Sequence, residues 1–386
     1  MGRGRRTLVA AALTTTVVTG TAGWAAGTEQ IPVTGPPPGT ASWRADHTLG
    51  TALPDPATAR PAQVAAFFAS MSATELRKLV RRHPGVVGNL DGAPITARYE
   101  ANALALAAAR DEERARAKDP ELTSQDHELA RSLITRYTEL LVPGRQILAF
   151  DPRGRGQIAE VFGDLAGAKH VSVVVPGSDI DLGSFDRADK GYGTPVGMAR
   201  SLRQTAGPGT AVVAWVGYTT PVGIGPDVAT GRLAEAGAPR LARFVSGLTA
   251  AGTPKPSVFC HSYGSVVCGR AASRMPASDL IVLASPGMRA DTVADLHTRA
   301  RVWAAKDDND WISKVPNVEL FGLGHGPDPT APEFGARRVP AKNATGHSGY
   351  FAPGTDSLRA FADIATGSAE RHGAATGTGI REGVLS

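Results

Sequence analysis

The stretch "CHSYGS" places Ser262 directly after the apolar run "PSVF" and directly before "GSVVCGRAASRM", which has the length and composition of a helix. A serine on a tight turn between a buried strand and a helix presents its hydroxyl as a nucleophile. Such a turn brings backbone atoms close together, so the positions flanking the serine need small residues. Gly264 fills the second of these positions, and Cys260 fills the first, where glycine is usual. We therefore predict that Ser262 is a nucleophile; the alternative is a chance serine in a turn.

An acid and a base for this serine follow later in the chain. The strand-like run "RVWAA" leads into "KDDND", which offers Asp307, Asp308 and Asp310. His347 lies near the C-terminus in the loop "ATGHSGYF". Serine, acid and histidine in that sequence are the chain order of the α/β-hydrolase fold. Histidine can remove the serine proton at neutral pH, and a carboxylate fixes the tautomer of the histidine and stabilises its imidazolium.

Three alternatives compete with this Ser262, Asp310 and His347 triad. The segment "KDDND" is also typical of a solvated acidic turn, and a loop histidine often has no chemical role. His325, in the glycine-rich stretch "GLGHGPD", is a rival base, although it comes earlier in the chain than this fold requires.

Two backbone amides are candidates for an oxyanion hole, which acyl transfer needs to stabilise the charge that develops on the carbonyl oxygen. The first is the amide of Tyr263, the residue after the nucleophile. The second is the amide of Ser178, in the loop after the strand-like run "HVSVVVPG". The alternative for that loop is a plain exit from a strand into a turn.

Cys260 and Cys268 are the two cysteines of the chain. They form no CxxC motif and have no histidine pair in register, so they do not predict a zinc site. A strand and a helix pack closely at a nucleophile elbow, which could bring the two sulfur atoms together. A disulfide is therefore one expectation, and two buried free thiols are the other.

The second half of the chain alternates strand-like apolar runs with segments of helix length. Most of these runs are continuous rather than alternating, which is typical of strands buried on both faces. The fold class we predict is α/β, with a mainly parallel sheet flanked by helices. The runs are "HVSVVVPG", "AVVAWVG", "PSVFCHS", "LIVLASPG", "RVWAAK" and "VELFGLG", and they follow a predicted antiparallel hairpin of "QILAFD" and "QIAEVFG".

Composition divides the chain into five segments. In the helical one, "SATE" (Ser72 to Glu75) is a capping box, and a short connection to the core predicts that these helices pack on the core. The segments are a signal peptide (1–26), a Pro/Gly/Thr-rich linker (27–60), a helical segment (61–142), a hydrolase core (143–368) and a flexible tail (369–386).

The N-terminus has the features of an export signal. The basic start "MGRGRR" precedes a small-residue apolar stretch and a possible cleavage position after Ala25, and "RRTLV" has the form of a twin-arginine signal. We therefore expect a secreted or cell-surface protein with no stable membrane span after cleavage; the alternative is an uncleaved anchor. The formal net charge of +5 includes Arg3, Arg5 and Arg6, so composition does not favour a nucleic-acid partner.

The sequence predicts no cofactor and no metal, because its glycine-rich stretches do not complete a nucleotide-binding motif and its spaced acids do not match a calcium loop. The expected partner is a small-molecule ester or lipid substrate. Several aromatic residues after strand ends or near His347 either line an acyl pocket or belong to the core: Trp215, Tyr218, Tyr350 and Phe351.

The chain resembles an actinobacterial α/β-hydrolase family, known as a domain of unknown function, with a helical segment ahead of the core. The resemblance spans roughly residues 61–366 and rests on "HPGVVGNLDGAP", "RYEAN", "VVVPGS", "CHSYGSVVCG", "FGARRV" and "GHSGYF". It implies a serine hydrolase whose acid ends a phrase like "AAxxxGD", which favours Asp310 over Asp307 and Asp308. We expect an esterase or a lipase-like enzyme; the alternative is a non-catalytic exported protein that uses the fold for binding.

Overall fold

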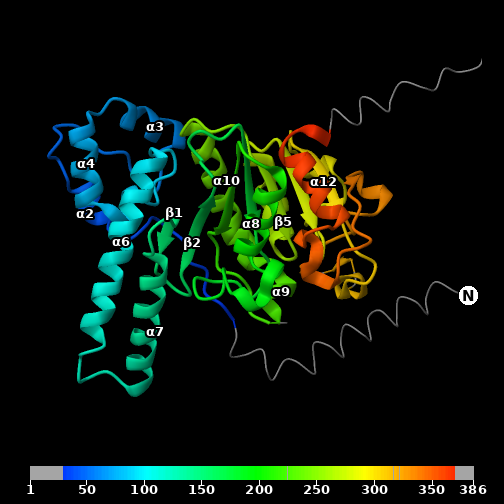
Figure 1. Cartoon of the computed structure of the whole chain (residues 1–386), viewed down its shortest axis with the longest axis horizontal. Coiled ribbons are helices and arrows are strands. Elements are labelled where there is room, and N and C mark those ends of the chain that lie inside the picture. Colours follow the sequence, from blue (N-terminus) through cyan, green and yellow to red (C-terminus); the bar gives the residue numbers. More distant parts are fainter. Residues whose placement is uncertain (1–28, 224, 316, 321, 370–386) are drawn as a thin grey trace, which may run out of the picture.

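The computed structural model describes residues 29–369 except 224, 316 and 321, and an eight-stranded sheet lies at its centre (Figure 1). The strand order in space is β1-β2-β4-β3-β5-β6-β7-β10. Only β2 runs against its neighbours, so the sheet is parallel apart from its β1–β2–β4 edge. The strands are β1 (Gln146–Asp151), β2 (Gln157–Phe162), β3 (His170–Val175), β4 (Thr210–Val216), β5 (Ser257–His261), β6 (Asp279–Leu283), β7 (Arg301–Ala305) and β10 (Arg337–Arg338).

Helices cover both faces of the sheet, which confirms the predicted α/β class. On one face, α10 (Arg232–Ala250) and α11 (Gly264–Ala271) pack on Val173 and its same-side neighbours. On the other face, α8 (Pro195–Ala206) and α12 (Asp356–Ala365) pack on Val174. Successive strand residues thus enter opposite clusters, and this explains why the strand sequences are apolar without a break.

The run "VELFGLG" was predicted to be a strand of this sheet, and that prediction is wrong. It forms β8 (Glu319–Leu320) and β9 (Leu323–Gly324), a separate antiparallel pair. Gly322, with a φ of 79°, makes the reversal possible, and Leu320 is exposed rather than buried. The strand that extends the sheet beyond β7 is β10, from the segment "FGARRV".

The helical segment packs on the core through its inner half. Its helices are α3 (Pro61–Ala69), α4 (Ala73–Arg82), α5 (Pro84–Val87), α6 (Ile95–Arg116) and α7 (Ser124–Leu140). The predicted capping box is confirmed, because Ser72 and Glu75 cap α4 reciprocally. Buried Arg98 and Asn102 on α6 donate hydrogen bonds to the carbonyls of Leu148 and Ile147 on β1, each at 3.1 Å.

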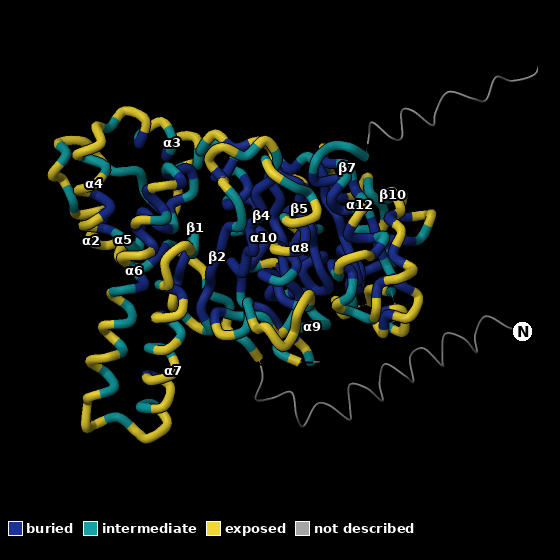
Figure 2. The backbone as a smooth tube through the Cα atoms, in the orientation of Figure 1, coloured by how far each residue is buried: buried dark blue, intermediate teal, exposed yellow. Residues whose placement is uncertain are grey.

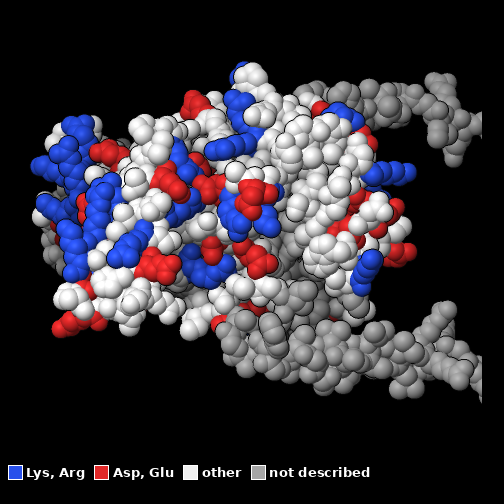
Figure 3. Space-filling model, turned by 60° about the horizontal axis from the view of Figure 1, so that its bottom comes forward, with Lys and Arg blue, Asp and Glu red and all other residues white. Residues whose placement is uncertain are grey.

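The outer half of α6 and α7 forms a two-helix arm that projects from the rest of the chain (Figures 1 and 2). Helix α6 runs on into this arm through the charged stretch "DEERAR". Leu129 of α7 is 51% exposed because it lies on this arm. Lys and Arg side chains are prominent at the helical end of the molecule, whereas both signs mix over the core (Figure 3).

Residues 29–60 are not the extended linker that composition predicted. They include α2 (Thr40–Arg44), whose Trp43 is fully buried against α4 and α5 and donates to the Pro54 carbonyl at 2.8 Å. Earlier in this segment, the Val33 amide donates to Thr219 of the core at 3.0 Å. The apolar Trp43, Leu49 and Leu53 supply buried contacts that Pro and Gly content alone conceals.

The predicted signal peptide lies outside the described residues, as do residues 27 and 28 and the tail beyond Ala369. Within the described part of the chain, no helix is long and apolar enough to cross a membrane. Short elements complete this part: α9 (Pro226–Thr230), and the 3-10 helices η1 (Ala188–Gly193), η2 (Ala272–Arg274), η3 (Ala294–Leu296), η4 (Trp311–Lys314), η5 (Pro332–Phe334) and η6 (Gly346–Phe351).

Candidate active site

Ser262 occupies the turn between β5 and α11 in a left-handed backbone conformation, with a φ of 54°. Non-glycine residues adopt this conformation rarely, and strained positions of this kind occur often at functional sites. Gly264 is required for steric reasons, since a Cβ there would lie 2.6 Å from the Val175 carbonyl oxygen and 2.7 Å from that of Pro176. The turn therefore has the tight geometry of a nucleophile elbow.

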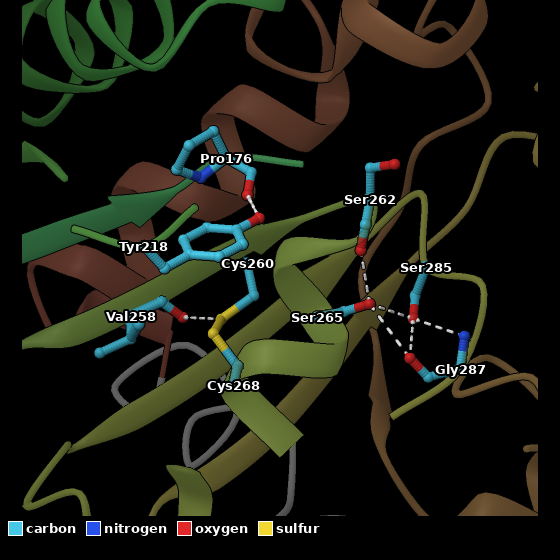
Figure 4. The surroundings of a disulfide bond; sticks show 9 residues. All are labelled: Pro176, Tyr218, Val258, Cys260, Ser262, Ser265, Cys268, Ser285 and Gly287. Carbon is cyan, nitrogen blue, oxygen red and sulfur yellow. Dashed lines mark hydrogen bonds between the residues drawn. A yellow bond between two sulfur atoms is a disulfide. The ribbon is translucent and has the colours of Figure 1, made fainter. Parts of the chain in front are cut away.

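A buried network of serine hydroxyls holds the elbow from below (Figure 4). The Ser265 hydroxyl donates to the Ser262 carbonyl at 2.6 Å and lies 2.7 Å from the Ser285 hydroxyl. Ser285 in turn accepts a hydrogen bond from the Gly287 amide at 3.0 Å. The first turn of α11 is thus tied to the loop after β6, an arrangement that the sequence did not indicate.

Cys260 and Cys268 are joined by a disulfide in the structure, with their Cα atoms 6.4 Å apart. The bond links Cys260, the next-to-last residue of β5, to Cys268 in the middle of α11, beneath the elbow (Figure 4). Both residues are fully buried. Cys260 therefore occupies the usual glycine position with its side chain turned toward the helix rather than toward Ser262.

Asp310 and His347 lie in direct contact, although 37 residues separate them in the chain. Nδ1 of His347 lies 2.9 Å from Oδ1 and 3.1 Å from Oδ2 of Asp310. Asp310 is buried, which opposes ionisation, but hydrogen bonds from His347 and the Ile312 amide outweigh burial and lower the pKa of its carboxyl. A carboxylate here fixes the Nδ1–H tautomer of His347 and leaves Nε2 free to accept a proton.

The other two acids of "KDDND" do not contact His347. Asp307 is buried and accepts from the Asn309 amide at 3.0 Å, whereas Asp308 is exposed to solvent. Asp310 alone of the three is aimed at the histidine, because it caps η4 and accepts from Ile312 there.

Tyr350 is a partner of Asp310 that sequence reasoning missed. Its hydroxyl accepts from the Asp307 amide at 2.9 Å and donates to Oδ2 of Asp310 at 2.8 Å. His347 and Tyr350 are three residues apart in η6, and residues at that spacing eclipse in a 3-10 helix. Both side chains therefore reach the same carboxylate. The three-residue spacing in "GHSGYF" would indicate this only if the segment were already known to form a 3-10 helix.

The ring of His347 is held between two other rings. Its centroid lies 4.6 Å from that of Trp311 and 4.8 Å from that of His261. Nε2 of His261 also donates to the His347 carbonyl oxygen at 2.7 Å. Burial lowers the pKa of His261 to about 3, with His347 contributing, so His261 is a neutral structural neighbour of the site.

In the described part of the chain, the Ser262 hydroxyl and His347 do not form the hydrogen bond that would complete a triad. Ser262 is 9% exposed, and its hydroxyl has no hydrogen-bond partner in that part of the chain. Catalytic hydrogen bonds are often long without substrate and tighten only in the complex. The loops that carry Ser262 and His347 are adjacent, since the side chain of His261, next to Ser262 in the chain, contacts the His347 ring.

His325, the rival base, is engaged elsewhere. Its Nε2 donates to the Val228 carbonyl at 2.5 Å, and its Nδ1 lies 3.4 Å from Nε of Arg289. Burial lowers the pKa of His325 to about 4. With both ring nitrogens occupied, His325 has no free position from which to act on Ser262.

The stability of the fold should decrease on mild acidification, because His261 and His325 are buried in the neutral form. Their folded-state pKa values of about 3 and about 4 lie below the ordinary value of 6.5. Between these values the unfolded chain binds protons that the folded chain does not bind. The free energy of unfolding should therefore fall as the pH drops from about 6.5 toward 4, by up to about 1.4 kcal/mol per pH unit for each histidine.

Denaturant unfolding between about pH 7 and pH 4 measures this slope. His325→Gln should give a shallower slope, whereas the exposed His47→Gln should leave the slope unchanged. A wild-type stability that stays constant over this interval would contradict the assignment of two neutral buried histidines.

The two predicted oxyanion donors are the Tyr263 amide, within the elbow, and the Ser178 amide, in the loop after β3. Among the described residues, neither the Tyr263 amide nor the Ser178 amide donates a hydrogen bond. Gly177 packs directly on the nucleophile, since a Cβ there would lie 2.6 Å from the Ser262 Cβ. Asp179, immediately after Ser178, has a left-handed backbone conformation with a φ of 64°. The loop after β3 is thus shaped around Ser262.

The aromatic residues that sequence analysis singled out do not form one pocket. Phe351 packs in the core against Phe259 and Phe361, and Tyr350 binds Asp310. Trp215 stacks on Tyr218 on the other face of the sheet. Trp311, which was not singled out, is the aromatic residue beside His347, and half of its surface is exposed.

The chain has the α/β-hydrolase fold, and comparison with known proteins agrees with this class. A family model described as Alpha/beta hydrolase matches residues 151–320, which include β2 to β8 and Ser262 and Asp310. This match, together with the sheet order, supports a hydrolase.

Two uncharacterized proteins from two strains of Mycobacterium tuberculosis are each 30% identical to this chain over 376 residues, an alignment that covers 82% of this chain. It covers 57% of each relative, so the chain spans a little over half the length of these curated relatives.

Solved structures of similar fold include an α/β serine hydrolase without a lid from Xanthomonas campestris, at 18% identity, covering 60% of this chain and 95% of that chain with a TM-score of 0.36. Carboxyl esterase 2 from Tuber melanosporum is similar at 11% identity, covering 58% of this chain and 86% of that chain with a TM-score of 0.34.

Proposed function

We propose that this protein is a secreted serine hydrolase that cleaves carboxylic esters, in the manner of an esterase or a lipase-like enzyme, through Ser262, His347 and Asp310. The observation that carries the proposal is the pairing of His347 with a buried, ionised Asp310, together with a serine in a left-handed elbow whose neighbour His261 contacts the His347 ring. Three separate strand-end loops supply these residues in the chain order of the fold. A binding protein would have no need of this arrangement.

The mechanism follows from the positions of the proton donors and acceptors. Nε2 of His347 takes the Ser262 proton while Oγ attacks the carbonyl carbon of the ester. The Tyr263 and Ser178 amides donate to the oxyanion of the tetrahedral intermediate. His347 then gives the proton to the departing alcohol, and the acyl group remains on Ser262. Water, deprotonated by His347, attacks this acyl-enzyme and releases the acid, and Asp310 stays ionised throughout.

The surroundings of His347 favour an apolar group on the ester. The half-exposed ring of Trp311 lies against the His347 ring and offers an apolar wall to substrate. Export is supported by the basic, small-residue N-terminus and by the Cys260–Cys268 disulfide, since disulfides persist mainly in oxidising compartments.

A fluorophosphonate probe tests the proposal, because it labels only serines that a neighbouring base activates. The wild-type protein should be labelled at Ser262, and Ser262→Ala should lose the label while melting at a similar temperature. Ser246→Ala is the matched control, because Ser246 is a half-buried serine on α10; this variant should be labelled at Ser262 as the wild type is. Labelling that persists in Ser262→Ala would contradict the nucleophile assignment. An unlabelled wild type would favour the alternative, a non-catalytic exported binding protein.

A further inference from the structure

A cavity of about 220 Å³ lies near the β1–β2–β4 edge of the sheet, where the N-terminal segment meets the core. The candidate triad follows strands toward the opposite edge of the sheet. Its walls come from the loop Gly35–Pro37, from α6, from β2 and the end of β4, and from α10. Neither Ser262, Asp310 nor His347 lines it. The cavity is therefore separate from the candidate active site.

Positive charge dominates the polar part of this cavity. Arg98, Arg240 and Arg243 line it, and in the described part of the chain Asp91 is the single carboxylate among the lining residues. Nη1 of Arg98 lies 3.3 Å from Asp91, and Nε of Arg243 lies 3.6 Å from the same residue. Nε of Arg240 donates to the Gly217 carbonyl at 3.1 Å instead. Two guanidinium groups thus contact the one carboxylate of the lining, and the third, Arg240, lies near that carboxylate and near Asp151 without an ion pair to either. The lining itself therefore carries more positive than negative charge.

Two of the lining side chains have buried polar atoms without a partner. Gln157, at the start of β2, is 3% exposed, and neither its Nε2 nor its Oε1 has a hydrogen-bond partner in the described part of the chain. Nη2 of Arg243 is likewise buried and unpartnered there. A buried polar group without a partner is costly, so such groups in a cavity indicate a ligand that completes their hydrogen bonds.

The remaining walls are apolar. Trp215 and Phe244, whose ring centroids lie 5.9 Å apart, form one side, and Pro36 and Pro37 contribute from the N-terminal segment. Burial also lowers the pKa of Arg240, because its charge is removed from water. A ligand with a negative charge and a small apolar body could pair with the arginine side chains and pack against the apolar side chains at the same time.

We propose that this cavity binds a small organic anion, with a carboxylate or phosphate group held by Arg243, Arg240 and Gln157 and an apolar body held against Trp215 and Phe244. Guanidinium groups bind both anions through paired, charge-assisted hydrogen bonds. The amide of Gln157 supplies one further donor. Because the walls belong to the N-terminal segment and to the core, the ligand also joins these two parts, and its binding stabilises the folded chain.

Calorimetric titration of the full-length Ser262→Ala protein tests the site independently of any hydrolysis. The probes are benzoate, phenyl phosphate and the neutral benzamide. One or both anions should bind saturably and raise the melting temperature, and benzamide should bind far more weakly. Tighter binding of benzoate would assign the site to carboxylates, and tighter binding of phenyl phosphate would assign it to phosphates. Either result supports the proposal.

Two variants locate the binding. Arg243→Gln and Gln157→Leu should each weaken anion binding, the arginine change by about tenfold or more, because a charge-assisted hydrogen bond is lost. Arg270→Gln, a half-exposed arginine on α11 outside the cavity, is the control and should change nothing. Absence of saturable binding by both anions, equal binding of benzamide, or full affinity in both cavity variants would overturn the proposal.

Discussion

Replacing Asp310 with asparagine should lower kcat for ester hydrolysis by about 10⁴-fold. The carboxylate accepts hydrogen bonds from His347, from the Ile312 amide and from the Tyr350 hydroxyl. An asparagine amide carries no charge to stabilise the imidazolium that forms when Ser262 loses its proton. It also turns an N–H group toward one of these donors, which disturbs the orientation or the tautomer of His347.

Initial rates with a chromogenic short-chain ester measure this effect, with burst kinetics to follow the acyl-enzyme. Asp308→Asn is the matched control, because Asp308 is exposed in the same turn and should retain wild-type kcat. The pairing would be refuted if Asp308→Asn lost as much activity as Asp310→Asn. Retention of full activity by Asp310→Asn would refute it as well.

Gly177→Ala should reduce kcat/KM by about 100-fold or more while the protein remains folded. The added Cβ would lie 2.6 Å from Cβ of Ser262, closer than real contacts allow, and 3.0 Å from its Oγ. Either the nucleophile moves or the loop that carries the Ser178 amide moves. A displacement of about 1 Å at a reacting group is enough to cause a loss of this size.

Gly183→Ala is the control for this substitution. Gly183 belongs to the same loop after β3, but a Cβ there would approach only Oδ1 of Asp181, at 3.4 Å. Its activity should stay close to that of the wild type. If Gly177→Ala hydrolyses esters normally and is labelled by the fluorophosphonate probe at the normal rate, Gly177 does not constrain the nucleophile.

Much of the fold was visible in the sequence because burial on both faces leaves a local signal. Val173 and Val174 enter different hydrophobic clusters, so β3 had to be apolar at successive positions. The capping box of Ser72 is equally local. The β8–β9 pair misled the prediction because exposed Val318, Leu320 and Leu323 imitate a buried strand.

Features that depend on distant segments were not predictable. Trp43 reaches the core of the helical segment from a stretch whose Pro and Gly content indicates a linker. Tyr350 and His261 support the Asp310–His347 pair, but their roles depend on turn type and on the meeting of two loops. The cavity around Gln157 is assembled from five or more separate stretches of chain, none of which carries a motif of its own.

The disulfide beneath the elbow has a consequence for how this sequence can change over evolutionary time. Loss of either Cys260 or Cys268 alone removes the cross-link beneath the elbow and its stabilisation, and it leaves one buried, unpaired thiol. Loss of both, with glycine restored at position 260, returns the elbow to its usual form. Substitutions at positions 260 and 268 should therefore be coupled. Among homologous sequences, cysteine at the position of Cys260 should occur together with cysteine at the position of Cys268.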